Sequence, residues 1–420
     1  MPDIVFLRKR GFIYLINTYE RQRDILKLIS QFDISMTMYK NADEKYHAVA
    51  RFLEDCDIKA DIYPQGSFAF GTVLRPSTKD PDANYDLDFI CQLHATRDNI
   101  APSELQKKIE NVLSNSSRYG EGKLTVYPEC FTIEYADING VGFTIDIVPA
   151  VDESPNRKLE LMGKSPRPDL LHSAIAIPIH NGERNYRWLT NNPIGFKKWF
   201  DEINRPFLDS RKTEIRKALF EENRAYYNSI EEIPAYMERS SIQRVIQILK
   251  FHRNEFYKNL PDGDAIKPIS AIINTLVTDI ARTASPTLGI FELLNHVLFE
   301  LSIYAHHQNM HHEAFENEYG SRVAITHKDG KWEIQNPANP EDNLANKWNQ
   351  NPDIPKYFFL WIAACTNDLI TSLSLSDSTF RASMDNAFGA ENIKKSWGTK
   401  YKSVTPKPII PTKAARPYRF

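Results

Sequence analysis

The 420-residue sequence has few cysteines, almost no net charge and no long hydrophobic run. Its four cysteines, Cys56, Cys91, Cys130 and Cys365, form no C-x-x-C pair, so the sequence indicates neither a zinc ribbon nor a disulfide framework. Lys and Arg total 52 and Asp and Glu total 54, which gives a net charge of −2. Any contact with nucleic acid would therefore depend on a local basic patch and not on a global positive field.

The sequence also shows neither a transmembrane segment nor a secretory signal peptide. The longest apolar run covers the nine residues 357–365, whereas a transmembrane helix needs about 20. The first residues, MPDIVFLRKRGF, lack the apolar stretch of a secretory signal peptide. We therefore expect a cytoplasmic protein that does not associate with membranes.

The composition is that of an ordinary globular protein. With 42% hydrophobic and 25% charged residues, the chain is not of the disordered, collagen-like or coiled-coil class. At roughly 150 residues per domain, the length predicts two or three domains or one bilobed enzyme.

Hydrophobic periodicity divides the chain into a strand-rich part and a helical part. Residues 11–56 have helical periodicity, whereas residues 60–151 have the shorter apolar pattern of strands. The strands are expected at residues 60–64, 86–91, 130–138 and 141–148. Asn139-Gly140 separates the last two and predicts a two-residue hairpin turn, in which Ile133 would lie opposite Asp146.

Beyond residue 152 the pattern changes again. Pro155, Pro166, Pro168 and Pro178 predict an irregular crossover, and helical periodicity dominates after Pro193. The helices are expected at residues 195–203, 238–257, 268–282, 287–306 and 356–373. Strands with intervening helices followed by a run of helices predict an α/β or α+β fold with a helical second lobe.

Three aspartates in this pattern are candidates for chemistry. Asp86 and Asp88 stand two residues apart in a predicted strand, so their side chains share one face with Cα atoms roughly 6.6 Å apart. Asp146 follows in a later strand and would complete a trio if the two strands are neighbours. Such a cluster of hard oxygen ligands favours Mg²⁺ or Mn²⁺, although a D-x-D motif alone is also typical of ordinary strand ends.

A glycine-serine turn precedes the aspartates. Gly66-Ser67 follows the predicted strand 60–64 and opens the segment FAFGT. Backbone N–H groups at such a turn can approach a phosphate closely, and the hydroxyl adds a donor. The dipeptide alone is common, but its position ahead of the D-x-D strand and the third aspartate makes an ordered constellation.

In this order, GSFAFGT, YDLDF and FTIDIVP resemble the motifs of polymerase-β-type nucleotidyltransferases, and most closely those of the bacterial cGAS/DncV-like enzymes (CD-NTases), relatives of oligoadenylate synthase. RVIQILKFHRN, KPIS and NPANPEDNLANKW are similar to later segments of that family. The resemblance runs from about residue 35 to about residue 373. It implies an α+β fold: a polymerase-β-like core with a mixed twisted sheet, a helical second lobe and an active site in the cleft between them.

The resemblance also implies domain limits and site residues. The catalytic core would cover residues 1–185 with its N-terminal helices, the oligoadenylate-synthase-like lobe 186–400, and a flexible basic, proline-rich tail 401–420. Asp86, Asp88 and Asp146 would hold two Mg²⁺ (or Mn²⁺) ions. The triphosphate would be bound by a second group of residues, Gly66, Ser67, Lys250 and Ser270.

By this resemblance the chain would join NTPs, ATP among them, into a cyclic di- or trinucleotide for anti-phage signalling of the CBASS type. The diffusible product would act on an effector protein, and a regulatory protein partner would be in keeping with the family. No zinc-ribbon insertion or long basic surface is present in the sequence, so we expect no requirement for double-stranded DNA. Two alternatives remain at this point: transfer of nucleotides to an RNA or protein acceptor, and a catalytically silent nucleotide-binding scaffold.

Of four other segments, three allow two interpretations each. The first is the run His306, His307, His311, His312 and Glu313, which fits either a metal site or, better, a solvated helix end. The second is Arg184, Tyr186, Arg187 and Trp188, which could line the cleft and stack on a base or could cap the interface between lobes. Trp199 and Phe200 are expected in the core. The basic tail fits a disordered end better than a partner-binding segment.

Overall fold

The computed structural model describes residues 4–9, 12–75, 85–120, 122–135, 143–180, 185–224 and 227–402. The strands in this part of the chain are β1 (Ile4–Lys9), β2 (Phe12–Asn17), β3 (Ala60–Pro64), β4 (Tyr85–Thr96), β5 (Leu124–Val126), β6 (Phe131–Tyr135), β7 (Phe143–Asp152), β8 (Ile175–His180), β9 (Tyr186–Asn191), β10 (Thr326–Lys328), β11 (Lys331–Glu333), β12 (Gln335–Asn336) and β13 (Asn339–Asn343).

The α-helices are α1 (Thr18–Ser30), α2 (Met36–Asp55), α3 (Gly66–Ala69), α4 (Pro102–Ser114), α5 (Pro155–Lys164), α6 (Pro193–Ser210), α7 (Lys212–Glu222), α8 (Ser241–Lys258), α9 (Gly263–Ile266), α10 (Ser270–Ala281), α11 (Ile290–Tyr304), α12 (His312–Tyr319), α13 (Asp353–Leu369), α14 (Asp377–Phe388) and α15 (Ala390–Trp397). Short 3₁₀ helices η1 (Pro168–Ser173), η2 (Ile230–Glu232), η3 (Ala235–Met237), η4 (Ala305–Gln308), η5 (Asn346–Asn349) and η6 (Thr371–Ser374) join them. Within the described residues, no helix has both the length and the apolar character needed to cross a bilayer.

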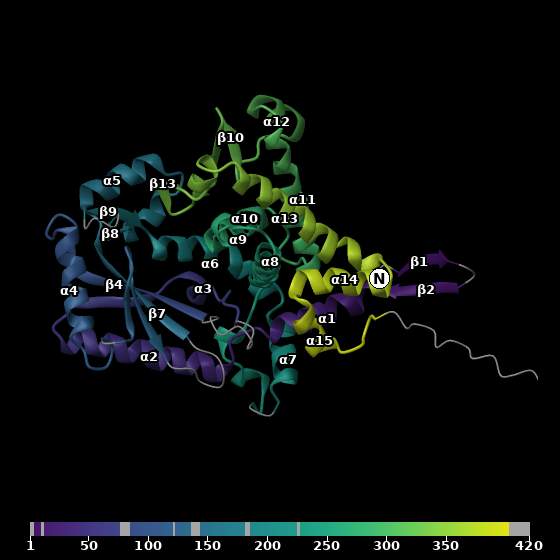
Figure 1. Cartoon of the computed structure of the whole chain (residues 1–420), viewed down its shortest axis with the longest axis horizontal. Coiled ribbons are helices and arrows are strands. Elements are labelled where there is room, and N and C mark those ends of the chain that lie inside the picture. Colours follow the sequence, from purple (N-terminus) through teal and green to yellow (C-terminus); the bar gives the residue numbers. More distant parts are fainter. Residues whose placement is uncertain are drawn as a thin grey trace, which may run out of the picture.

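A mixed seven-stranded sheet forms the first part of the molecule. Its main strand order is β3-β4-β7-β6-β5, and β8 pairs with both β7 and β9. The central pair β4 and β7 is parallel, and the pairs around it are antiparallel. Helices α2 and α4 lie on the same side of the sheet (Figure 1).

Side-chain alternation explains why these strands have one apolar face. Leu87, Phe89 and Cys91 are at most 2% exposed and pack in one cluster with Ile145 and Ile147. Residues of α2 and α4 complete this cluster. The predicted inward direction of the odd-numbered residues in this strand is therefore confirmed, and it leaves the even-numbered positions on the opposite face.

The register of β6 and β7 differs by one residue from the predicted hairpin. Thr132, not Ile133, lies opposite Asp146, and Ile133 lies opposite Ile145. A two-residue turn leaves an even number of residues between opposed positions, whereas Tyr135 and Phe143 are paired across the seven residues 136–142. The Asn139-Gly140 turn itself lies outside the described residues.

Two other predictions of secondary structure were wrong. Residues 12–17 form strand β2 and not helix, and the proline-containing crossover is largely ordered as α5, η1 and β8. Pro155 begins α5, where a backbone N–H has no intrahelical partner, and the Ser154 side chain caps that end. Pro178 is tolerated in β8 because β7 pairs with that strand only at Ile175 and Ala176.

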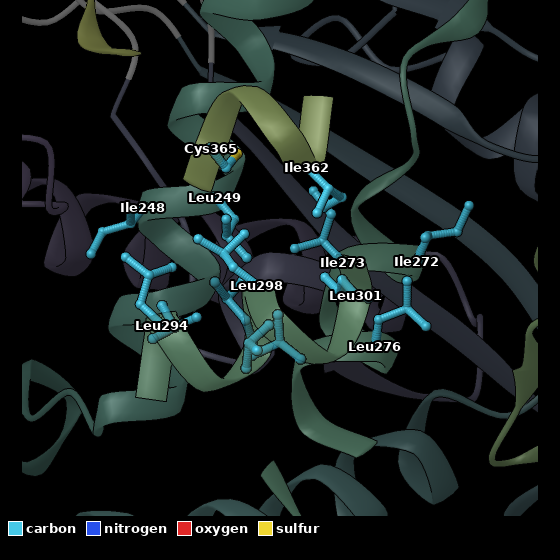
Figure 2. Packing of buried hydrophobic residues seen from close by; sticks show 14 of the residues in the cluster. Ile248, Leu249, Ile272, Ile273, Leu276, Leu294, Leu298, Leu301, Ile362 and Cys365 are labelled. Atoms are coloured by element: carbon cyan, nitrogen blue, oxygen red, sulfur yellow. The ribbon is translucent and has the colours of Figure 1, made fainter. Parts of the chain in front are cut away.

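The second part of the molecule is a helical lobe built around α8. Figure 2 shows the apolar side chains of α8, α10, α11 and α13 that meet there. Ile248 and Leu249 of α8 are almost completely buried, as is Cys365 of α13. The predicted α+β architecture with a helical second lobe is confirmed, and Trp199 and Phe200 lie in its core as expected.

Helix α1 precedes the region from residue 35 onward in which the sequence motifs were found, and it packs against this helical lobe. Ile25, Leu28 and Ile29 are completely buried in the helical core. The Arg21 guanidinium donates to the carbonyl oxygens of Leu373 at 3.0 Å and Leu375 at 2.7 Å. The N-terminal helix is thus tied to the C-terminal helices.

Candidate active site

The site is built on the polar face of β4 and β7. The two strands run in parallel with Asp86 opposite Thr144 and Asp88 opposite Asp146. Opposed residues in neighbouring strands lie on the same face, so the Asp88 and Asp146 carboxylates lie side by side. The predicted adjacency of the two strands is confirmed, and the backbone of Asp86 lies two residues before Asp88 on the same strand.

Asp146 receives a hydrogen bond from the neighbouring strand. The Thr132 hydroxyl donates to Asp146 Oδ1 at 2.6 Å. Nearby, burial raises the pKa of the Cys130 thiol to about 12, and the negative charge of Asp146 adds to this increase. The Cys130 thiol therefore stays protonated at neutral pH. The hydrogen bond from Thr132 orients the Asp146 carboxylate.

The glycine-serine turn lies against the aspartates. Gly66 begins the short helix α3, and the N–H of the preceding Gln65 donates to the Asp88 carbonyl oxygen at 2.8 Å. A Cβ atom added to Gly66 would stand 2.3 Å from Asp88 Oδ2, and the positive φ of 61° also favours glycine. Only glycine thus allows this turn to approach the carboxylate so closely.

Lys250 faces the same region from α8. Its side chain is only 7% exposed, and its Nζ donates to the carbonyl oxygen of Thr72 at 3.1 Å. Burial lowers the pKa of Lys250 to about 7; the positive charge of Arg253 lowers it further, and Asp88 opposes the decrease. Lys250 shares one polar face of α8 with Gln243 and Gln247, and this face is turned inward, not towards solvent.

Ser270 begins α10 and lies beside a second buried cation of α8. The Arg253 guanidinium donates to Ser270 Oγ at 3.3 Å and to the carbonyl oxygen of Pro268 at 2.9 Å. Burial lowers the pKa of Arg253 to about 10. Ser270 is thus held at the cleft wall by Arg253.

A cleft of about 720 Å³ brings these groups together. Of the sequence-predicted residues whose side chains are described, Gly66, Ser67, Asp88, Lys250 and Ser270 line it. Asp146 is beside Asp88 in the sheet, and the structure does not describe the side chain of Asp86.

Sequence reasoning missed several polar groups of this cleft. They come from α8, the segment before α10 and the segment that follows β11: Arg253, Asn254, Lys267, Asn336, Asp342 and Lys347. Arg253 lies one helical turn after Lys250, and this spacing was a signal available in the sequence. Lys347 stands in the NPANPEDNLANKW segment, whose similarity to the family did not indicate which of its side chains face the cleft.

The histidine run does not form a metal site in the described part of the chain, where no group of three His, Cys, Asp or Glu side chains is placed to hold an ion. His307 is 1% exposed and its ring stacks on Phe315 with centroids 3.6 Å apart. Burial lowers its pKa to about 4. The expectation of a solvated helix end was therefore wrong for His307, although His306 and His311 are exposed.

Trp188 lines a neighbouring cleft of about 700 Å³, not the one that contains Asp88. The two clefts share Asp342 and Asn346. Arg187 is exposed, and Arg184 lies outside the described residues, as do residues 403–420 of the basic tail.

Comparison with known proteins supports the fold. Residues 20–161 match the family model of the Second Messenger Oligonucleotide or Dinucleotide Synthetase (SMODS) domain. Over 351 residues the chain is 22% identical to a c-di-GMP synthase of Roseivirga ehrenbergii, covering 82% of this chain and 77% of that protein.

Two solved structures share the fold over almost their whole length. The CD-NTase CdnG of Bradyrhizobium diazoefficiens in complex with GTP is 19% identical, with a TM-score of 0.60 and coverage of 89% of this chain and 97% of that one. CdnC of Escherichia coli in its complex with HORMA-deltaN is 14% identical, with a TM-score of 0.53 and coverage of 88% and 96%.

Paired aspartates on adjacent parallel strands, a glycine turn against them and a helical lobe across the cleft define a nucleotidyltransferase of the polymerase-β type. Through the SMODS match over residues 20–161 and the shared fold, the chain is similar to the cGAS/DncV-like nucleotidyltransferases, the CD-NTases.

Proposed function

We propose that this nucleotidyltransferase condenses nucleoside triphosphates into a cyclic di- or trinucleotide and releases pyrophosphate. The observation that carries the proposal is the placement of Asp88 beside Asp146, with Gly66 in contact with Asp88. The SMODS match and the c-di-GMP synthase similarity support the type of product.

The aspartates fit a divalent cation. Asp88 and Asp146 offer carboxylate oxygens from adjacent strands, and Asp86 precedes Asp88 by two residues on the same strand. Such hard oxygen donors suit Mg²⁺ or Mn²⁺, and two ions per site would match the three carboxylates. Bound metal would lower the cost of deprotonating the acceptor hydroxyl and neutralise charge on the phosphates.

The remaining chemistry is positioning of the triphosphate. The acceptor hydroxyl oxygen forms a bond to the α-phosphorus and its proton passes to solvent water. The bond between the α-phosphorus and the bridging oxygen breaks, and its electron pair leaves with pyrophosphate. Gly66 and Ser67 bind the β- and γ-phosphates from the core. Lys250 and Ser270 bind them from the helical lobe, where Arg253 fixes Ser270.

Cationic groups around the cleft fit a polyanionic substrate. Arg253, Lys267 and Lys347 join Lys250 in its wall, which concentrates positive charge opposite the aspartates in a chain of net charge −2. Such a local field favours a triphosphate without attracting nucleic acid to the whole surface. The substrates would be NTPs, ATP among them, in keeping with the GTP found in the CdnG structure.

The biological setting we propose is anti-phage signalling in the cytoplasm. A cyclic nucleotide diffuses to an effector protein, so the synthase needs no stable contact with it. The CdnC–HORMA-deltaN complex supports a regulatory protein as a further partner.

The experiment that tests the function is incubation of the purified chain with four NTPs, each labelled in turn, in Mg²⁺ or Mn²⁺. We expect pyrophosphate and a labelled product that resists phosphatase, since a ring has no terminal phosphate. A product that appears only after RNA or another protein is added would replace the proposal with transfer to a macromolecular acceptor. Nucleotide binding without pyrophosphate under every condition would indicate a silent scaffold.

A further inference from the structure

Three buried polar side chains of α8 donate hydrogen bonds to the backbone that follows the glycine-serine turn. Gln243, Gln247 and Lys250 recur at the spacing of one helix face and each donates a hydrogen bond to a carbonyl oxygen within residues 70–73. We call these three side chains the donor row. Residues 70–73 directly follow α3, the helix that begins with Gly66 and Ser67.

Gln243 has two roles at once. Its Nε2 donates to the Phe70 carbonyl oxygen at 2.8 Å, and its Oε1 accepts from the Ser240 N–H at 2.9 Å in the capping box of α8. A Cβ atom on Gly71 would stand 2.7 Å from this Nε2, so a glycine is needed for the approach. One amide therefore joins the first turn of α8 to the end of α3.

Gln247 repeats the arrangement one turn later. It is completely buried, and its Nε2 donates to the Val73 carbonyl oxygen at 3.1 Å and to Asp33 Oδ1 at 2.9 Å. Asp33 is paired with Arg244 at 2.7 Å. The turn between α1 and α2 therefore also contributes to holding the segment.

Burying amides is costly unless they are hydrogen-bonded, and apolar side chains would pack the two lobes together at lower cost. The donor row does something that apolar contacts cannot, because directional bonds fix the segment along its length. α3 is a single turn of helix, so a displacement at Phe70 is passed on to Gly66, which lies against Asp88.

We propose that Gln243 is a positioning residue for nucleotidyl transfer: it holds the glycine-serine turn at the distance from Lys250 and Asp88 that a bound triphosphate requires. The inference rests on the proposed function of the cleft. It assigns to Gln243, which does not line the cleft, a role exerted through the Phe70 carbonyl.

Gln243→Glu separates the two roles of the side chain. A glutamate at this position still accepts from the Ser240 N–H and suits the N-terminus of a helix, but it places an oxygen against the Phe70 carbonyl where the Nε2 donor was. We expect the KM for NTP, and the Kd of a non-hydrolysable NTP analogue, to rise about 10- to 100-fold, since small misplacements have effects of this size. The buried glutamate should lower the thermal unfolding midpoint, so both constants are measured at a temperature at which the variant is folded.

Two control variants test whether the change is specific. Gln308→Glu makes the same chemical change at an exposed amide that donates to the Ala305 carbonyl oxygen on the outside of the lobe, and KM should stay at the wild-type value. Ser240→Ala removes the hydroxyl that caps Gln243 N but leaves the bond to Phe70, so it should lower stability and leave KM unchanged. A KM in Ser240→Ala as high as in Gln243→Glu would overturn the proposal, because general loosening would then explain both.

Gln247→Met provides a second test if the buried glutamate prevents folding. It keeps the length of the side chain and removes the donor to Val73, so KM should rise in the same direction. Wild-type analogue affinity in folded Gln243→Glu, or in Gln247→Met, overturns the role of the donor row and leaves the proposed function standing. If the wild type binds the analogue but forms no pyrophosphate, the proposed function fails, and weaker analogue binding in Gln243→Glu still supports the positioning role.

Discussion

Asp88 on β4 and Asp146 on β7 lie opposite each other in a parallel pair of strands, one interstrand spacing apart. That spacing is about 4.8 Å, which is close enough for two carboxylates to share one cation. On the other edge of β7, the antiparallel pairing with β6 places Thr132 opposite Asp146. The geometry of the acids is therefore set by backbone pairing and then adjusted by one hydroxyl.

The first prediction concerns that hydroxyl. Thr132→Val keeps the side-chain shape and removes the donor to Asp146 Oδ1. We expect kcat to fall by about 10- to 100-fold, the equivalent of roughly 1.5–3 kcal/mol for a hydrogen bond to a charged group. Steady-state pyrophosphate release measures it. Thr132→Ser retains the hydroxyl and should stay within about threefold of wild type, so equal losses in the two variants would contradict the role of the hydrogen bond.

The second prediction concerns the contact between the turn and the acid. Gly66→Ala would place a methyl group 2.3 Å from Asp88 Oδ2, so either the turn or the carboxylate must move. We expect kcat/KM to fall about 100-fold or more, while circular dichroism shows an unchanged fold.

Gly122→Ala is the matched control for Gly66→Ala. Gly122 also has a positive φ, but nothing lies within 4 Å of the added Cβ. The Gly122→Ala variant therefore has the strain of an alanine at positive φ but no clash with a neighbouring atom. Activity lost equally in both variants would mean that strain, and not contact with Asp88, is responsible.

The third prediction follows from the pKa of Lys250, which burial lowers to about 7. In the free protein the ammonium group is charged below this pH and largely neutral above it, whereas a bound triphosphate favours the charged form. NTP binding at pH 8.5 should therefore take up close to one proton, and binding at pH 6 close to none. Calorimetry in buffers of different ionisation enthalpy measures the uptake. Lys250→Met should abolish the difference between the two pH values, and uptake that is the same in both proteins would assign it to another group.

The lowered pKa also affects folding. In the unfolded chain Lys250 has its ordinary pKa near 10.5, so between about pH 7 and that value the unfolded state binds more protons. The contribution of Lys250 to the free energy of unfolding therefore rises with pH across this window. The change should be absent in Lys250→Met.

The fourth prediction concerns stability away from the cleft. Arg21→Met removes the buried hydrogen bonds to the carbonyl oxygens of Leu373 and Leu375, which leaves these acceptors without that donor. We expect the free energy of unfolding to fall by about 2–3 kcal/mol. Arg23→Met changes an exposed arginine of the same helix and should have little effect. Urea denaturation compares the two, and similar losses would show that α1 is not anchored through Arg21.

The sequence allowed the acidic face to be predicted because strand alternation is local: Leu87 and Phe89 face the core, so Asp88 between them faces away from it. The sequence predicted that Asp146 would join Asp88 only if their two strands were neighbours, and the parallel pairing of β4 and β7 makes them so. The register was off by one, because an Asn-Gly pair does not by itself fix where the turn falls.

The interior position of Lys250 could not be read from periodicity. The polar face of α8 looks like a solvent-exposed face until the residues that cover it are known, and Phe70 is 173 residues from Gln243 along the chain. The same applies to α1, whose apolar side chains Ile25 and Leu28 pack against a lobe built from residues that lie hundreds of positions later in the sequence. Contacts of this kind depend on tertiary packing, which no local pattern encodes.

The central claim is that carboxylates paired across β4 and β7 perform metal-dependent nucleotidyl transfer. Its most direct test is NTP-dependent pyrophosphate release by Asp88→Asn and Asp146→Asn, with Asp61→Asn as the control for an exposed acid of the same sheet. We predict that release requires Mg²⁺ or Mn²⁺, stops with EDTA, falls by about 1,000-fold or more in the first two variants and is unchanged in the third. Wild-type release in either Asp88→Asn or Asp146→Asn would contradict the account.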